Sequence, residues 1–315
     1  MTEQQAISDP HAAIASERYR RSRGLWRVLA FVALGIAVLV GLGRFALPER
    51  GLGDHIARLV IDGAISTDTK RLEAIRELAE DDSVKAVIVA INSPGGSTAG
   101  GEELYEALYR LREAKPTVAV IKELGASAAY MAAIGTDRIF ARRLSIVGSI
   151  GVLYQHVNAG KLLDTIGLDF DKVASGPLKA EPDFNEPLDG APRASIAALV
   201  DDSFQWFVDI VAERRNLARP EALALADGRI LSGRVGVQSG LIDAIGGETE
   251  AIEWLEAERG IAADLEIDTA WPEPDTGFSL LGTILGGQAR AALGLPEGPI
   301  TLDGLVSLWQ VGPRS

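Results

Sequence analysis

The stretch AVIVAINSPGG, residues 86–96, decides the fold class. Its six leading apolar residues are typical of a strand buried on both faces, and the Pro-Gly-Gly break ends that strand. Similar apolar runs occur at 57–65 and 116–121, and helical periodicity separates the three runs at 69–80 and 102–114. Buried strands that alternate with helices predict an α/β fold with a parallel sheet and crossover helices.

Further elements are expected downstream of this core. We predict a peripheral C-terminal appendage over residues 259–315, which are rich in Gly and Pro toward the end. The helix at 192–215 carries apolar residues on two faces, with Trp206 and Ile210 turned away from Phe204 and Val208, which predicts burial on two sides and a subunit interface on one of them. The remaining predicted elements are helices at 127–134, 158–166, 220–226, 233–240 and 248–259, and a strand at 138–141.

The segment KELGASAAYMAAIG, residues 122–135, consists mainly of residues with small side chains. Small residues around Ser127 would let a substrate backbone approach, and the start of a helix favours developing negative charge. The local sequence alone fits an N-cap role for Ser127 better than a nucleophilic one. A second motif, INSPGG at 91–96, follows a predicted strand. Its two glycines would let main-chain N–H groups approach a ligand closely, but an ordinary turn explains the motif equally well.

A nucleophilic serine needs a base, and histidine is scarce in this chain. His11 and His55 lie before or at the start of the predicted domain, and His156 reads as an ordinary surface or part-buried residue. A lysine can act as the base when its surroundings keep it neutral. Lys179, in a Gly-Pro-interrupted loop, is the candidate, although most lysines are solvated, Lys161 and Lys172 nearby included.

Composition limits the remaining classes of function. The formal net charge of −13 makes nucleic acid an improbable partner, and the absence of cysteine excludes disulfides and thiolate chemistry. It likewise excludes metal sites built from cysteine.

A membrane anchor is expected near the N-terminus. Residues 28–43 carry no charge, and the apolar stretch at 25–47 approaches the roughly 20 residues that span a bilayer. No small-x-small cleavage site follows directly, so an uncleaved anchor is favoured over a signal peptide. The arginine excess precedes the span, which predicts a cytoplasmic tail at 1–24 and an extracytoplasmic domain. The preceding arginines are Arg18, Arg20, Arg21, Arg23 and Arg27.

Five blocks in order resemble the signal peptide peptidase A family of S49 serine peptidases, in its short, single-domain bacterial form. The blocks are INSPGG (91–96), ELGASAAY (123–130), VGSIGV (147–152), ASGPLKAEPDF (174–184) and ADGRILSGRVGVQSGLID (226–243). The resemblance implies a Clp protease/crotonase-like fold over a peptidase domain at 54–258.

The resemblance also implies roles for particular residues. Ser127 matches the family nucleophile, Lys179 its general base and Ser149 the serine that helps to hold the lysine. The main-chain N–H groups of Gly96 and Ala128 would form the oxyanion hole. Alanine follows Ser127 where glycine is common in relatives, which keeps the N–H donor but alters the pocket.

The expected protein is therefore a single-pass serine endopeptidase of the bacterial inner membrane. It would degrade cleaved signal peptides on the periplasmic side with a Ser-Lys dyad, and this reading implies no metal and no cofactor. By the same resemblance, closed homo-oligomeric rings would admit only unfolded or short peptides. The alternative is a non-hydrolytic crotonase-like membrane scaffold or an acyl-thioester-binding protein, because this architecture hosts several chemistries.

Overall fold

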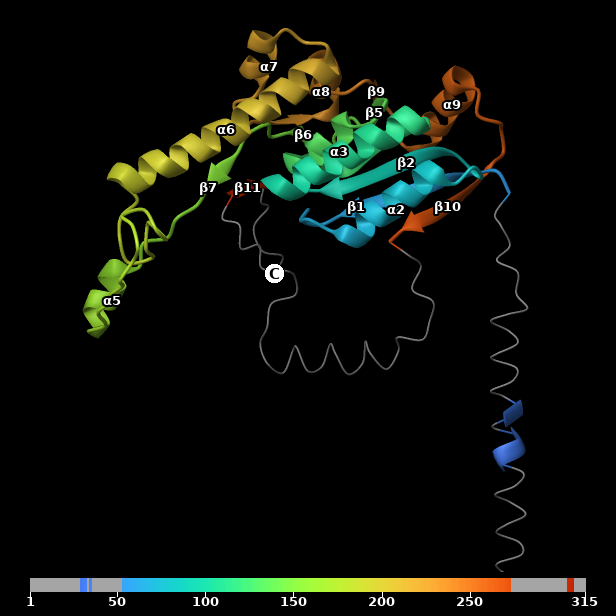
Figure 1. The fold of residues 1–315 in the computed structure, drawn as a ribbon. Coiled ribbons are helices and arrows are strands. Elements are labelled where there is room, and N and C mark those ends of the chain that lie inside the picture. The colour runs from blue at the N-terminus through green and yellow to red at the C-terminus, as the bar shows by residue number, and fades with distance from the viewer. Residues whose placement is uncertain (1–28, 33, 36–52, 273–304, 309–315) are drawn as a thin grey trace, which may run out of the picture. The chain divides into compact units, whose positions relative to one another are not determined.

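The computed structural model describes residues 29–32, 34–35, 53–272 and 305–308 (Figure 1). It divides into two units, Met1–Gly53 and Asp54–Ser315. Most of the predicted anchor at 25–47 lies outside the described residues, although residues 29–32 and 34–35 are helical. Within the described part, no helix is both long and apolar enough to cross a bilayer.

An eight-stranded, mainly parallel sheet forms the centre of the second unit. The strand order is β10-β1-β2-β4-β5-β9, every neighbouring pair is parallel, and β6 and β8 continue from β4. The predicted α/β fold with a parallel sheet and crossover helices is thereby confirmed. The strands are β1 (His55–Asp62), β2 (Val84–Ser93), β4 (Thr117–Ala126), β5 (Arg138–Ala141), β6 (Ile146–Gly148), β8 (Ile230–Ser232), β9 (Ala244–Ile245) and β10 (Glu266–Trp271).

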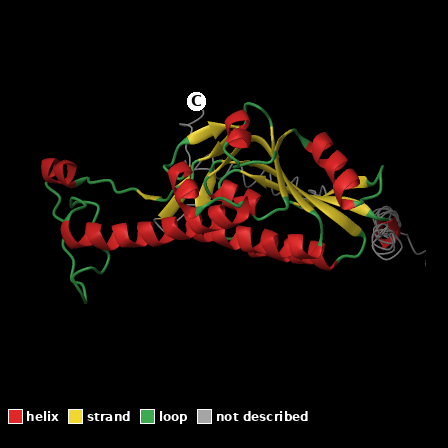
Figure 2. Cartoon of the chain, turned by 90° about the horizontal axis from the view of Figure 1, so that it is seen from above, coloured by secondary structure: helices red, strands yellow, loops and turns green. Residues whose placement is uncertain are grey.

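Helices cover the sheet, as the view from above in Figure 2 shows. Alternate residues of the central strands face opposite sides: Val87 and Val89 belong to the larger core, whereas Ile88 packs in a smaller core with Leu255. Burial on both faces explains why these strands are continuously apolar. The helices are α2 (Thr69–Glu80), α3 (Thr98–Ala114), α4 (Ala128–Ile134), α5 (Gly160–Ile166), α6 (Gly190–Arg215), α7 (Arg219–Leu225), α8 (Gly233–Gln238) and α9 (Glu248–Arg259).

Some boundaries differ from the expected ones for local reasons. Helix α3 begins at residue 98 rather than 102 because the Ser97 side chain accepts a hydrogen bond from Gly100 N (3.1 Å) and caps the helix. Strand β4 continues to Ala126, where the predicted strand stopped at residue 121. Residues 266–271, within the expected appendage, form β10 and pair with β1 in the main sheet.

The two-faced pattern of α6 has an internal explanation. Ile210 is buried in the chain's own core, and Trp206 packs edge-on against Tyr105 with ring centroids 5.9 Å apart. Burial of this part of the helix on two sides is therefore confirmed, with both sides packed within the chain, and a subunit interface on one of them stays a prediction. Exposed apolar surface lies instead in the first half of α6, where Leu199 is 51% exposed.

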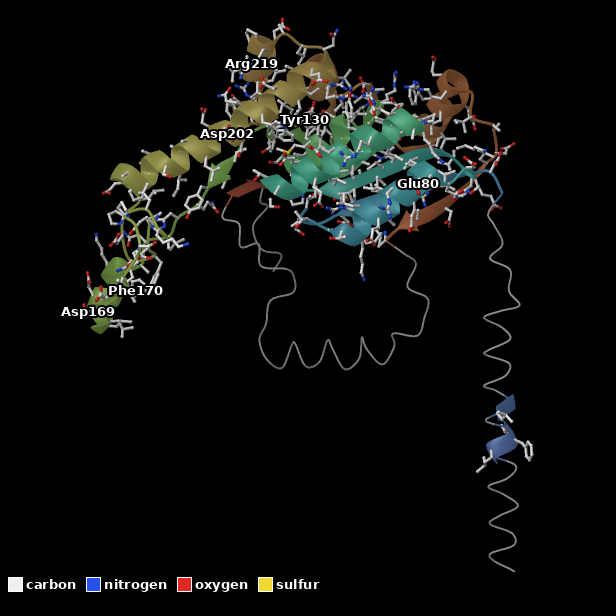
Figure 3. All side chains as sticks on the ribbon, in the orientation of Figure 1. Glu80, Tyr130, Asp169, Phe170, Asp202 and Arg219 are labelled. Atoms are coloured by element: carbon white, nitrogen blue, oxygen red, sulfur yellow. The ribbon has the colours of Figure 1, made fainter. Side chains whose placement is uncertain are left out.

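Residues 155–189, between β7 (Leu153–Tyr154) and α6, form a segment that we call the arm. Figure 1 shows α5 beyond the N-terminal end of α6, away from the sheet, and Asp169 and Phe170 lie at that end in Figure 3. None of the α5 residues is buried. Exposed apolar side chains of the arm are Val157, Leu162, Ile166, Leu168, Phe170, Val173, Leu178 and Phe184.

Candidate active site

Ser127 occupies the turn between β4 and α4, at the carboxyl edge of the sheet. Its φ of 59° and ψ of −123° are unfavourable for a residue with a Cβ atom. Its main-chain N–H donates to Gly148 O (2.9 Å), so the neighbouring β6 end helps to hold the turn. Ser127 stands at the N-cap position of α4, as the local sequence predicted, but its side chain makes no capping hydrogen bond to that helix.

The small residues of this segment are required by close packing behind Ser127. Every residue of α4 is buried, and a Cβ atom on Gly101 of α3 would lie only 2.9 Å from the Ala128 Cβ atom. Tyr130, the large residue of α4, is fully buried and donates its hydroxyl hydrogen bond to Leu241 O (2.7 Å). Burial raises the pKa of Tyr130 far above its ordinary value. Bulkier neighbours would push α3 and α4 apart and displace Ser127.

Gly96 lies in β3 (Gly95–Ser97), which contacts α4. Ile65 N donates to Gly95 O (2.8 Å) and Ser97 N donates to Ile65 O (2.9 Å). The polar main-chain groups of Gly95 and Ser97 that form these bonds therefore point toward Ile65. Because alternate residues of a strand point their polar groups to opposite sides, the N–H of Gly96 faces away from Ile65. A Cβ atom on Gly96 would overlap the main chain of Ile65, which explains the glycine at this position.

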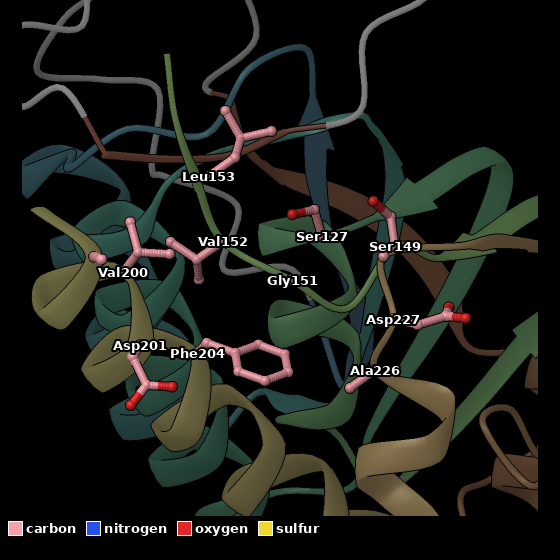
Figure 4. A pocket seen from close by; sticks show the side chains of 12 residues that line it. Ser127, Ser149, Gly151, Val152, Leu153, Val200, Asp201, Phe204, Ala226 and Asp227 are labelled. Carbon is pink, nitrogen blue, oxygen red and sulfur yellow. The ribbon is translucent and has the colours of Figure 1, made fainter. Parts of the chain in front are cut away.

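Ser149 follows β6 and also has a positive φ, 51°. Its N–H donates to Arg229 O (2.8 Å), and it is nearly buried. Ser127 and Ser149 line one cavity of about 620 Å³, and Figure 4 shows them on the side opposite Val200 and Asp201. The structure therefore brings together two of the predicted site residues.

The cavity is mainly apolar and its polar groups are hydroxyls and carboxylates. The lining contains no Lys, Arg or His among the described residues. Such a cavity has the size and polarity to hold an apolar group of a ligand. The full lining is Ser127, Ser149, Gly151, Val152, Leu153, Ala197, Val200, Asp201, Phe204, Ala226, Asp227 and Gly228.

Lys179 lies in the arm and does not line this cavity. Its side chain is exposed, and in the described part of the chain it forms no ion pair. Lys172 differs: its ammonium contacts Glu181 (2.7 Å) and Asp183 (2.5 Å), which raise its pKa and keep it protonated. Lys172 is thus unsuited to be a base, whereas Lys179 has no such partner among these residues.

The two histidines in the described part of the chain do not supply a base to Ser127 either. His55 is buried at the start of β1, and His156 lies in the arm with Nε2 2.8 Å from Glu186 O. Neither lines the cavity. Within the described residues, no group of three or more acidic or histidine side chains is placed to hold a metal ion.

Two features of the cavity were missed by sequence reasoning. One is the wall from α6, formed by Ala197, Val200 and Phe204, which nothing in the local pattern of that helix signalled. The other is Asp227, which pairs with Arg229 and whose pKa that guanidinium lowers to about 2. Asp227 belongs to the block at 226–243, whose resemblance to the family assigns no role to this residue.

Comparison with known proteins gives consistent matches. Residues 109–262 match the family described as Peptidase family S49. A Synechocystis protein named "Putative protease slr0021" is 36% identical over 68% of this chain and 78% of its own length. An Enterococcus faecium protein named "Putative signal peptide peptidase SppA" is 29% identical over 76% of this chain and 68% of its own. "Capsid assembly protease C" of phage lambda is 26% identical, over 69% and 48% respectively.

Proposed function

Since the chain belongs to peptidase family S49 and is a serine peptidase, we propose that it is a membrane-anchored endopeptidase with Ser127 as nucleophile. The observation that carries this assignment is the position of Ser127, in a strained turn at the carboxyl edge of a parallel sheet and at the rim of an apolar cavity. Ligands of open α/β sheets bind at this edge.

In the proposed reaction, the Ser127 hydroxyl attacks the peptide carbonyl and Lys179 accepts its proton. The lysine then returns the proton to the leaving amine, and water hydrolyses the acyl-enzyme. The N–H of Gly96, which faces away from Ile65, and the N–H of Ala128 at the start of α4 stabilise the oxyanion. Ser149, at the same cavity, orients the lysine.

Lys179 reaches this site from a neighbouring subunit in our proposal. Within one chain it lies in the arm, outside the cavity that Ser127 lines. The arm exposes apolar side chains such as Leu162 and Phe170, a surface expected to pack against protein. A ring of identical subunits, each lending its arm to the next, would complete every site and restrict access to unfolded or short peptides.

We further propose that the substrates are remnants of cleaved signal peptides, and that the chain is anchored through residues 25–47. The apolar cavity suits the hydrophobic segments of such peptides, and the name of the Enterococcus relative points to the same class. In this arrangement the Clp protease/crotonase-like domain faces the periplasm. A reporter enzyme that works only after export, fused after residue 60, should be active, and an inactive reporter at this position would argue for the reverse orientation.

The dyad is tested by mixing two inactive variants. Ser127→Ala and Lys179→Ala should each abolish hydrolysis of a fluorogenic peptide, while Lys161→Ala, in exposed α5, should retain it. When the two inactive chains are co-assembled at equal amounts, about one site in four should combine an intact serine with a neighbour's intact lysine. Activity should return to roughly that fraction of the wild-type value.

The outcomes separate the parts of the proposal. Hydrolysis by Lys179→Ala alone would refute the dyad, and exchange of subunits without recovery would refute supply by a neighbour. Light scattering of a chain beginning at residue 51 reports the assembly independently, and full activity at the monomer mass would refute the ring. No hydrolysis of any peptide by the wild-type chain would favour the non-hydrolytic alternative.

A further inference from the structure

Residues 170–184 form the loop of the arm that carries Lys179, and we call this segment the lysine loop. Its two ends meet through Phe170 and Phe184, whose rings pack edge to face with centroids 5.1 Å apart. Phe184 O also accepts a hydrogen bond from Ala159 N (2.6 Å), which joins this end to an earlier part of the arm. Figure 3 shows Phe170 at the end of the arm, away from the sheet. These contacts all lie within the arm, so the arm's own residues set the shape of the loop.

One ammonium group contacts three residues that follow Lys179. The Nζ atom of Lys172 lies 2.7 Å from Glu181 Oε1 and 2.5 Å from Asp183 Oδ2. It also donates a hydrogen bond to Ala180 O (3.4 Å). The side chains of Lys172, Glu181 and Asp183 are only 26%, 15% and 14% exposed. Because they are partly shielded from water, salt screens these pairs less than it screens ordinary surface ion pairs.

The main chain beside Lys179 is strained. Ala180 has a φ of 62°, a left-handed conformation that is uncommon for a residue with a Cβ atom. The carbonyl of this residue is the one that Lys172 contacts. On the other side of the turn, Lys179 N donates to Gly176 O (3.1 Å). Strained conformations persist where the surrounding structure holds them, and they are concentrated at functional sites. Lys172 is thus placed to hold the turn that contains Lys179.

The two carboxylates need a cation between them. Both lie against the same ammonium, so they also lie close to each other. The second carboxyl oxygen of Glu181 is buried and has no hydrogen-bond partner in the part of the chain that the structure describes. Without Lys172, the carboxylates of Glu181 and Asp183 would repel each other with no cation to compensate for their burial. The loop would then open and change the direction of Lys179.

We propose that Lys172 is a positioning residue for the general base, because its ammonium closes the lysine loop and fixes the direction in which Lys179 points. This inference rests on the proposed function, since it takes Lys179 as the base. The two lysines have opposite tasks: Lys179 must lose its charge to act, whereas Lys172 must keep its charge. Asp183 and Glu181 raise the pKa of Lys172, so it stays protonated at neutral pH.

The test compares the kinetics of full-length variants on a fluorogenic peptide. Lys172→Met removes the ammonium but keeps a long side chain. It should lower kcat by about 10–100-fold, because a misplaced catalytic group costs rate. KM should change by less than about twofold, since the described lining of the cavity includes no residue of the arm. Lys172→Arg keeps a cation for both carboxylates and should have a kcat within about threefold of the wild type. Lys161→Met, at an exposed lysine of α5, is the matched control and should leave kcat unchanged.

Two further measurements distinguish positioning from a general loss of structure. Hydrogen exchange of the Lys179 amide, which donates to Gly176 O, should be faster in Lys172→Met and unchanged in Lys172→Arg. Equal unfolding midpoints would show that the domain is intact. When mixed with Ser127→Ala chains, Lys172→Met chains should recover activity as Lys179→Ala chains do, because their own serine is intact. A defect that also disturbed the serine site would not be complemented in this way.

Three results would overturn the proposal. They are a kcat of Lys172→Met equal to that of Lys161→Met, a loss confined to KM, and a loss that Lys172→Arg does not reverse. Full activity of Lys179→Ala would refute the dyad, and the role of Lys172 with it; because this result comes from a different variant, the two failures are distinguishable. If mixing restores neither lysine variant, supply by a neighbour is refuted, and the kcat comparison still decides the role of Lys172.

Discussion

Replacing Ser127 by glycine should stabilise the protein while removing its nucleophile. The residue has φ 59° and ψ −123°, a conformation that glycine adopts freely and that a Cβ atom disfavours. Alanine at the same position also removes the hydroxyl but keeps the Cβ atom. The pair of variants therefore isolates the strain of the turn from every interaction that the hydroxyl makes.

The expected difference follows from two opposing effects. A strained backbone conformation of this kind costs about 1–3 kcal/mol in the folded state, and glycine relieves it. Glycine also gains about 0.4–1 kcal/mol of backbone freedom in the unfolded chain, which opposes folding. The Ser127→Gly chain should thus be more stable than the Ser127→Ala chain by about 1 kcal/mol. For a domain of this size that difference is a rise in Tm of about 2–4 °C.

The measurement is thermal and urea unfolding of both variants, with peptide hydrolysis as a check that both are inactive. Equal urea m-values would show that the comparison concerns the folded turn and not the denatured state. A glycine variant that is less stable than the alanine variant would refute the reasoning. That result would mean that the turn at residue 127 is not strained, and that interactions of the serine hydroxyl are needed to hold the turn in place.

The other predictions concern pH, packing and the cavity rim. Peptidase activity should rise as the pH increases from neutral into the alkaline range, because an amine base works only when neutral, and a rate that is already flat near pH 5 would indicate a carboxylate base. Tyr130→Phe should lower the free energy of unfolding by about 1–3 kcal/mol, because Leu241 O loses its donor inside the core; an unchanged urea midpoint would contradict this. The Asp227 carboxyl, with its pKa lowered from 3.8 to about 2, should favour the folded loop above pH 4 and lose that contribution as the pH falls toward 2. Asp227→Asn should remove this acid dependence in a urea titration, and an identical pH profile would argue against the pair with Arg229.

Local patterns were sufficient for the sheet because they were strong there. The apolar run of β2 is buried on both faces, and the helix predicted at 69–80 is observed as α2 over the same residues. Patterns failed where a distant segment decides the structure. Strand β10 is an edge strand with alternating polar residues, and its partner β1 lies about 200 residues earlier in the chain. The residues around Glu266 therefore contain no local pattern that predicts the strand.

The candidate site shows the same division. Ser127 and Ser149 were expected from motifs, and the structure places both at one cavity. The strained φ of Ser127 could not be read from a sequence in which serine before a helix usually signals a cap. The wall from Phe204 and the pairing of Ser307 with Gly96 depend on contacts across about 80 and 200 residues of chain, which local periodicity does not report.

The hydrogen bond from Tyr130 to Leu241 joins residues that are 111 positions apart, so the order of synthesis has a consequence for the nucleophile. While the ribosome is still making residues before 241, helix α4 lacks the acceptor for its buried hydroxyl, and Ile139 lacks Asp243, which it contacts through its N–H (2.8 Å). Contacts of such long range form late in folding. The packing that holds helix α4 behind Ser127 is therefore complete only after residue 243 has been translated, so a shorter nascent chain lacks part of the support for its own nucleophile.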